Sequence, residues 1–148
     1  MLDLIIKNGS CYIDKDLKDQ DIAIKDGKII KIGKIDSEAK ETFDAKGLTV
    51  LPGCIDTQTH FREPGSTDTE DLHSGSRAAI VGGITSVFEM PNTNPPTSTK
   101  VEFQKKLDLA KNRMYCNYAF YFGATADNAN ELADLVNLEG CCGIKLFA

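Results

Sequence analysis

Short apolar runs separated by turn residues fill the first 51 positions of the chain. The runs lie at residues 2–7, 11–13, 21–25 and 28–32. Asn8-Gly9 and Asp26-Gly27 stand between them, and such dipeptides favour tight hairpin turns. Lysines and aspartates interrupt the apolar positions, which is typical of a sheet with one face in water. The pattern predicts a small antiparallel β module over residues 1–51.

From residue 48 onward, strand-like and helix-like patterns alternate. Buried strands are predicted at residues 48–55, 84–90, 115–122 and 141–147. Helices are predicted after the capping patterns Thr67-x-x-Glu70 and Thr99-x-x-Glu102 and over residues 128–136, the first ending at Gly82-Gly83. Strands alternating with helices form right-handed βα units around a parallel sheet. We therefore predict an α/β fold in which residues 52–148 hold about the first four βα units of a TIM-like barrel.

Polar side chains follow the first of these strands. Asp56, Gln58 and His60 come directly after the apolar run, and strand alternation predicts that they share one face. On the inner face of a barrel they would converge where a metal or an anionic substrate could be held. Arg62 then offers a planar fork that suits a carboxylate. The alternative interpretation is a polar strand end followed by the Glu63-Pro64-Gly65 turn.

This stretch carries a resemblance to a known family. The order Asp56-x-Gln58-x-His60-x-Arg62 followed by Glu-Pro-Gly resembles the first metal-binding motif of the dihydroorotases, which belong to the amidohydrolase superfamily. The family usually has His where this chain has Gln58, and an amide oxygen is a poorer zinc ligand than an imidazole. Two later segments also resemble family motifs: Met90-Pro91-Asn92-Thr93, and Gly-Ile-Lys-Leu-Phe around Lys145.

The resemblance implies a role for each matching residue. His60 would bind the first metal, with Gln58 as a weak ligand beside it. Lys145, once carbamylated, would bridge two zinc ions, whereas Arg62 and Asn92 would hold the substrate carboxylate. The reaction would be the reversible cyclisation of N-carbamoyl-L-aspartate to dihydroorotate in pyrimidine synthesis. Without the resemblance, Asn92 is ordinary turn chemistry and Lys145 is an edge lysine whose amine reaches water.

Length and composition limit these expectations. The chain has 148 residues, and a complete barrel needs about 250. The net charge is −5 without a basic block, so neither a nucleic-acid partner nor a membrane surface is indicated. Five cysteines without Cys-x-x-Cys spacing indicate reduced thiols, and no apolar run reaches the ~20 residues of a membrane span. We predict a cytoplasmic protein.

The resemblance covers the whole chain but only the N-terminal half of the family. Residues 1–51 match the β-sandwich module that precedes the family barrel, here incomplete. The one histidine besides His60 is His73, which the helical pattern places away from the strand ends. We therefore expect a truncated chain, inactive alone, with open barrel edges that a second segment or another copy could cover.

Two classes of function remain open from the sequence. The first is a cyclic amidohydrolase, either a dihydroorotase or a hydantoinase, acting on a small molecule. The second is a non-catalytic remnant or an interaction module. Arg62 together with Asn92 favours an anionic substrate within the first class.

Overall fold

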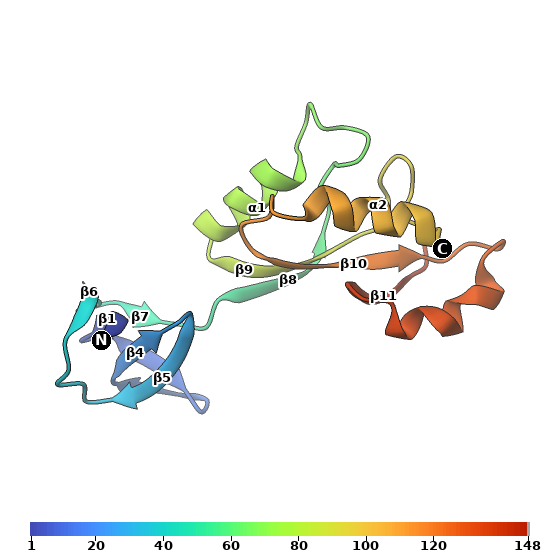
Figure 1. The fold of residues 1–148 in the computed structure, drawn as a ribbon. Helices are drawn as coiled ribbons and strands as arrows, with labels where there is room; N and C mark the ends of the chain where they lie inside the picture. Colours follow the sequence, from blue (N-terminus) through green and yellow to red (C-terminus); the bar gives the residue numbers. More distant parts are fainter. Residues whose placement is uncertain (148) are drawn as a thin grey trace. The chain divides into compact units, whose positions relative to one another are not determined.

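The computed structural model describes residues 1–147, which separate into two compact units (Figure 1). The first unit is Met1–Pro52, and the second begins at Gly53. Within the described residues, no helix is both long and apolar enough to cross a membrane.

The first unit contains two small sheets. Its strands are β1 (Leu2–Lys7), β2 (Ser10–Ile13), β3 (Asp16–Asp19), β4 (Asp21–Lys25), β5 (Lys28–Gly33), β6 (Ala39–Asp44) and β7 (Thr49–Val50). One sheet has the order β5-β4-β1-β6 and the other β3-β2-β7. The hairpin pairs are antiparallel, as predicted, but β1 pairs with β6 and β2 with β7 in parallel. The pairing is therefore mixed, because the chain returns along an edge strand after the hairpins are complete.

The two predicted turns differ in outcome. Asp26 and Gly27 both have positive φ, at 51° and 71°, and join β4 to β5 with Lys25 opposite Lys28. That is the geometry of a two-residue hairpin turn. Asn8-Gly9 instead leads from β1 in one sheet to β2 in the other. A side chain at Gly9 would lie 2.7 Å from Val50, so this glycine allows close packing and not a hairpin.

The second unit alternates strands and helices as predicted. Its elements are β8 (Cys54–Thr59), α1 (Leu72–Val81), β9 (Ile84–Glu89), α2 (Lys100–Ala110), β10 (Asn117–Gly123), the 3₁₀ helix η1 (Ala129–Asn137) and β11 (Cys141–Lys145). The strand order is β11-β10-β9-β8, and every neighbouring pair is parallel. The carboxyl ends of all four strands therefore lie at one edge of the sheet.

The starts of the helices test the two predicted capping patterns. Thr99 caps α2 and accepts a hydrogen bond from the Glu102 N–H at 3.1 Å, so the second pattern is confirmed. The first is wrong, because the cap of α1 is Asp71, which exchanges hydrogen bonds with Ser74. Asp71 stands directly before Leu72, and its carboxylate can cap the helix there, so the helix begins after Asp71 and not after Thr67.

The core of the second unit lies between the helices and one face of the sheet, with α1 and α2 over that face (Figure 1). Its fully buried residues include Leu72, Val87, Phe103, Phe120 and Leu135. Phe88 and Tyr121, which alternate with core residues, pack edge to face on the opposite side of the sheet.

The first strand of the second unit is not buried as predicted. β8 pairs with β9 alone and forms one border of the sheet, and Ile55 is 60% exposed. Apolar composition indicated a strand that is covered on both faces, whereas the border position leaves this strand open.

Candidate functional site

Two loops meet where β8 and β9 end. His60 follows β8, Asn92 follows β9, and the His60 Nδ1 lies 2.9 Å from the Asn92 Oδ1. The Asn94 N–H donates to the Pro64 carbonyl at 3.0 Å, which ties the same loops together a second time. Gly65, with φ of +118°, permits this approach, because a Cβ there would lie 2.8 Å from Asn94.

The contact with Asn92 orients the His60 ring. When the amide oxygen of Asn92 accepts, Nδ1 carries the proton and Nε2 keeps its lone pair. A carboxylate or carbonyl oxygen on one ring nitrogen is the usual arrangement when the other nitrogen binds a metal. In this tautomer, the lone pair of the His60 Nε2 is available to accept a ligand.

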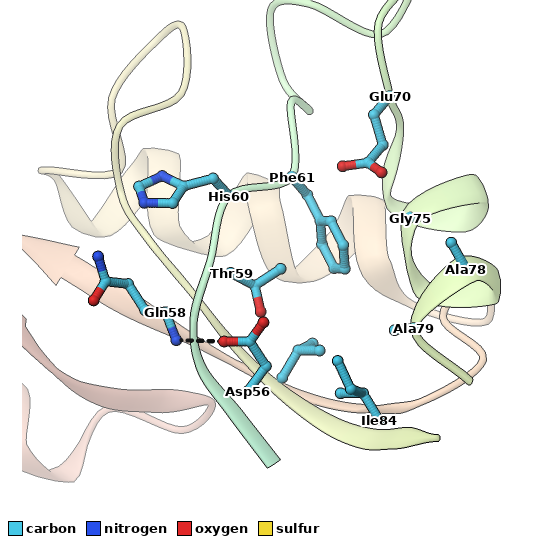
Figure 2. Close-up of a pocket in the computed structure, with 11 residues that line it drawn as sticks. Asp56, Gln58, Thr59, His60, Phe61, Glu70, Gly75, Ala78, Ala79 and Ile84 are labelled. Atoms are coloured by element: carbon cyan, nitrogen blue, oxygen red, sulfur yellow. Dashed lines mark hydrogen bonds between the residues drawn. The ribbon is translucent and has the colours of Figure 1, made fainter. Parts of the chain in front are cut away.

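Asp56 does not share a face with Gln58 and His60, contrary to the prediction. The β8–β9 register shifts between Asp56 and Thr59, which breaks the simple alternation. A cavity of about 360 Å³ beside α1 is lined by Asp56 and Thr59 and also by Gln58 and His60. In Figure 2 the side chains of Gln58 and His60 nevertheless leave the strand on the side opposite to that of Asp56. The Asp56 carboxylate accepts a hydrogen bond from the Gln58 N–H at 2.9 Å and so holds the irregular backbone.

The remaining predicted site residues, Arg62 and Lys145, lie after β8 and at the end of β11. Arg62 is exposed, and within residues 1–147 its side chain makes no hydrogen bond or ion pair. Lys145 ends β11, opposite Gly123 of β10. The apolar residues expected to bury Lys145 are themselves open, with Leu146 65% and Phe147 54% exposed, because β11 forms the other border of the sheet. The Lys145 Nζ lies 5.1 Å from the centre of the Phe147 ring.

A bidentate ion pair supports the first loop. Arg113 donates from Nη1 and Nη2 to the two oxygens of Glu63 at 2.8 and 3.0 Å, and Glu63 also accepts the Leu72 N–H. These hydrogen bonds raise the pKa of the Arg113 guanidinium above its ordinary value. Glu63 thus joins the loop after β8 to the start of α1 and the segment after α2. The motif at residues 60–65 had indicated only a turn at this position.

A second ion pair lies wholly inside the unit. The Lys106 Nζ of α2 is 2.8 Å from Glu89 Oε2, and the two side chains are 1% and 0% exposed. Burial raises the pKa of Glu89 to about 7, although Lys106 opposes the shift, and burial lowers the pKa of Lys106. The sequence held a signal for it, because Lys106 falls in the apolar stripe of α2 between Phe103 and Ala110.

The donors at this edge do not by themselves complete a metal site. They are one imidazole, the Gln58 amide and the Lys145 amine, and an open zinc site normally has three good protein ligands. Among residues 1–147, no three His, Cys, Asp or Glu side chains are grouped so that they could hold a metal ion. His73, the other histidine, lies on α1 with its Nε2 3.2 Å from the Tyr115 hydroxyl.

The chain is similar in sequence and in structure to known proteins. The chain is 41% identical over 146 residues to an allantoinase of Escherichia coli O1:K1, a match that covers 98% of this chain and 32% of the relative. Among solved structures it is similar to the L-hydantoinase (dihydropyrimidinase) of Arthrobacter aurescens, with a TM-score of 0.87, 34% identity, and coverage of 97% of this chain and 32% of that one. A D-hydantoinase from Thermus sp. gives a TM-score of 0.72 at 27% identity, covering 90% and 31%.

These likenesses confirm the predicted fold class, part of a TIM-like barrel preceded by a β module. The chain spans about a third of the length of the curated relatives it matches. The resemblance to the amidohydrolase superfamily is confirmed, with allantoinase and hydantoinases as the relatives and not specifically dihydroorotase. The model of the amidohydrolase family matches residues 49–140, and this chain belongs to that family.

Proposed function

We propose that this chain supplies the first four βα units of a metal-dependent cyclic amidohydrolase, which hydrolyses a C–N bond of a cyclic amide. The observation that carries the proposal is the meeting of His60 and Asn92 at the carboxyl edge of a parallel sheet. Active groups of such barrels lie at that edge. The kinship with allantoinase and hydantoinases supports the reaction class.

Each residue at the edge has a role in this proposal. Nε2 of His60 is the first metal ligand, with Gln58 as a weak neighbour, and Lys145 joins the site after carbamylation. Zinc, as one or two ions, is the metal proposed. Because the donors described above are too few, the remaining ligands come from later strands of the complete barrel. Arg62 is exposed two residues beyond His60, and in this proposal its guanidinium holds a negatively charged group of the substrate.

The proposed substrate class is a small cyclic ureide or amide of the allantoin or hydantoin type. The 41% identity to an allantoinase over nearly the whole chain supports this class. A second candidate is dihydroorotate, or N-carbamoyl-L-aspartate in the reverse direction. The pair of Arg62 and Asn92 favours it, because a cation and an amide donor together suit a carboxylate.

We also propose that the active form includes further strands that cover both borders of the sheet. β8 and β11 are paired on one side only, and the apolar side chains of Ile55, Leu146 and Phe147 are more than half exposed. Unpaired strand borders and exposed apolar groups favour association. The covering strands come from a second segment, with self-association of the chain as the alternative.

The proposal can be tested by complementation. The chain would be co-expressed with the C-terminal two thirds of the E. coli allantoinase, and turnover of allantoin, hydantoin and dihydroorotate measured with added zinc. We expect ring opening by the complemented pair, no turnover by the chain alone, and loss of turnover in a His60→Ala variant. His73→Ala is the matched control, because that histidine lies on α1 and contacts Tyr115.

The substrate that is turned over fastest distinguishes the two candidates. Arg62→Ala should raise KM for dihydroorotate much more than for uncharged hydantoin. A folded complemented pair that binds no metal and opens none of the three rings would contradict the amidohydrolase proposal. It would favour a non-catalytic interaction module.

A further inference from the structure

The buried ion pair of Glu89 and Lys106 lies immediately behind the site. Glu89 is the last residue of β9, three positions before Asn92, and Lys106 reaches it from α2. Within the described residues, neither oxygen of the Glu89 carboxylate makes a hydrogen bond of good geometry, and its charged neighbour is the Lys106 ammonium at 2.8 Å. A buried pair of charges seldom adds net stability compared with apolar residues of the same volume. We therefore expect this ion pair to have a role other than stabilisation of the fold.

Lys106 also contacts the backbone that leads into the site loop. Its Nζ lies 3.5 Å from the Met90 carbonyl oxygen, a long hydrogen bond, and 5.3 Å from the centre of the Phe120 ring. The Met90 N–H donates to the Thr59 carbonyl at 2.9 Å, one residue before His60. Met90 is thus held on one side by the strand that carries His60 and on the other by Lys106.

The rest of this loop is fixed at its far end. The Thr97 N–H donates to the Pro91 carbonyl at 2.9 Å, and the Thr97 carbonyl accepts the Gly123 N–H at 2.8 Å. Thr97 is 1% exposed, whereas Asn92 is exposed and makes its side-chain contact to His60. The position of the Asn92 amide therefore depends on the two buried anchors at Met90 and Thr97.

We propose that Lys106 and Glu89 are positioning residues for the contact between Asn92 and His60. The ammonium, held in place by the Glu89 carboxylate, fixes the Met90 carbonyl and so sets where Asn92 meets the His60 ring. This inference rests on the proposed function only in taking the His60 ring as a ligand. In that function, the ion pair keeps the Nε2 lone pair of His60 available without touching metal or substrate.

The tautomer of His60 reports this role directly. Long-range ¹H–¹⁵N spectra of the full 148-residue chain, at one fixed pH and without metal or substrate, resolve the two ring nitrogens of each histidine. The chain has two histidines, so His73 serves as an internal reference. Asn92→Ala would supply the spectrum of a His60 ring that has lost its partner.

Three variants test the ion pair. Lys106→Met removes the contact to Met90, and Lys105→Met is the matched control, because Lys105 is exposed on the same helix. Removal of one charge from a buried pair can unfold a protein. The double variant Glu89→Leu with Lys106→Met, which leaves no unpaired charge, therefore provides the deciding measurement.

We expect wild-type His60 to carry its proton on Nδ1. In both Lys106 variants, the His60 spectrum should shift to that of Asn92→Ala, with His73 unchanged and Lys105→Met like wild type. A folded double variant with the wild-type His60 spectrum would overturn the proposal. So would variants in which the His73 signals change as much as those of His60, because that result shows general loosening. The His60 spectrum is measured without turnover. The result of this test is therefore independent of whether the complementation assay supports the amidohydrolase proposal.

Discussion

Replacing Glu89 by Gln should change how the stability of the second unit depends on pH. Burial raises the pKa of Glu89 from 4.5 to about 7 in the folded chain. Because the folded value is above the unfolded one, the protonated carboxyl favours folding. Its contribution is complete below about pH 4.5 and is lost as pH rises through 7. Each pKa unit corresponds to 1.36 kcal/mol, so this shift implies on the order of 3 kcal/mol.

Glutamine imitates the protonated carboxyl in shape and charge, and its amide oxygen can still accept a hydrogen bond from the Lys106 ammonium. This change, unlike Lys106→Met, therefore leaves no buried charge without a partner. The variant should therefore match wild type near pH 4 and exceed it by about 3 kcal/mol near pH 8 in the free energy of unfolding. Lys106, whose pKa is lowered by burial, is present in both proteins. Glu89 opposes that lowering, so the loss of its carboxylate also changes Lys106, and the difference between the two curves reports the Glu89–Lys106 pair as a unit.

Urea unfolding followed by tyrosine fluorescence is a suitable assay. The chain has no tryptophan, and three of its four tyrosines, Tyr115, Tyr118 and Tyr121, belong to the second unit. The carboxylates of Asp3, Asp44 and Asp71, whose pKa values are lowered by hydrogen bonds, add stability that is lost in acid. They are common to both proteins. If Glu89→Gln were instead less stable than wild type at pH 8, the charged pair would be net stabilising and our reasoning refuted.

Three other changes have definite expected outcomes. Arg113→Met removes both hydrogen bonds to Glu63 and should lower the free energy of unfolding by about 2 kcal/mol, less than for a fully buried pair because Arg113 is 35% exposed. An unchanged urea midpoint would contradict it. Gly65→Ala, strained by its φ of +118° and by contact with Asn94, should cost about 1 to 3 kcal/mol, and a thermal melt that does not shift would count against the loop geometry. Burial raises the pKa of Cys142 to about 11, so at pH 8 a thiol reagent should modify exposed Cys54 well before Cys142. Mass mapping that finds Cys142 modified first would disprove this order.

The order of elements in the second unit was predictable because strands and helices have different apolar periods. Phe103 and Ala110 follow the helical period, and they pack in the core as expected. The irregularity in β8 was not predictable, because nothing in the residue types around Asp56 indicates a register shift. That shift depends on how β8 pairs with β9, which is a property of two strands and not of one.

The solvent exposure of the strands was less predictable than their order. Ile55 and Ile144 have the composition of covered strands, and they are 60% and 38% exposed because β8 and β11 border the sheet. Composition indicates what a strand can tolerate, whereas its position in the sheet decides what covers it. The contact between His60 and Asn92 was only partly predictable. Both residues were expected at one edge, but the sequence assigned Asn92 to a substrate and not to the imidazole.

Glu63 affects how mutant activities of the proposed enzyme should be interpreted. It sits inside the motif that resembles a metal-binding sequence, yet its carboxylate contacts Arg113 and the start of α1. In the proposed complemented enzyme, Glu63→Gln should weaken the hold on the loop that presents His60 and lower turnover, although Glu63 is not among the groups proposed to touch substrate. In a mutational survey scored by activity alone, Glu63 would pass for an acid or base of the reaction. A melting temperature measured beside each rate would separate the two roles.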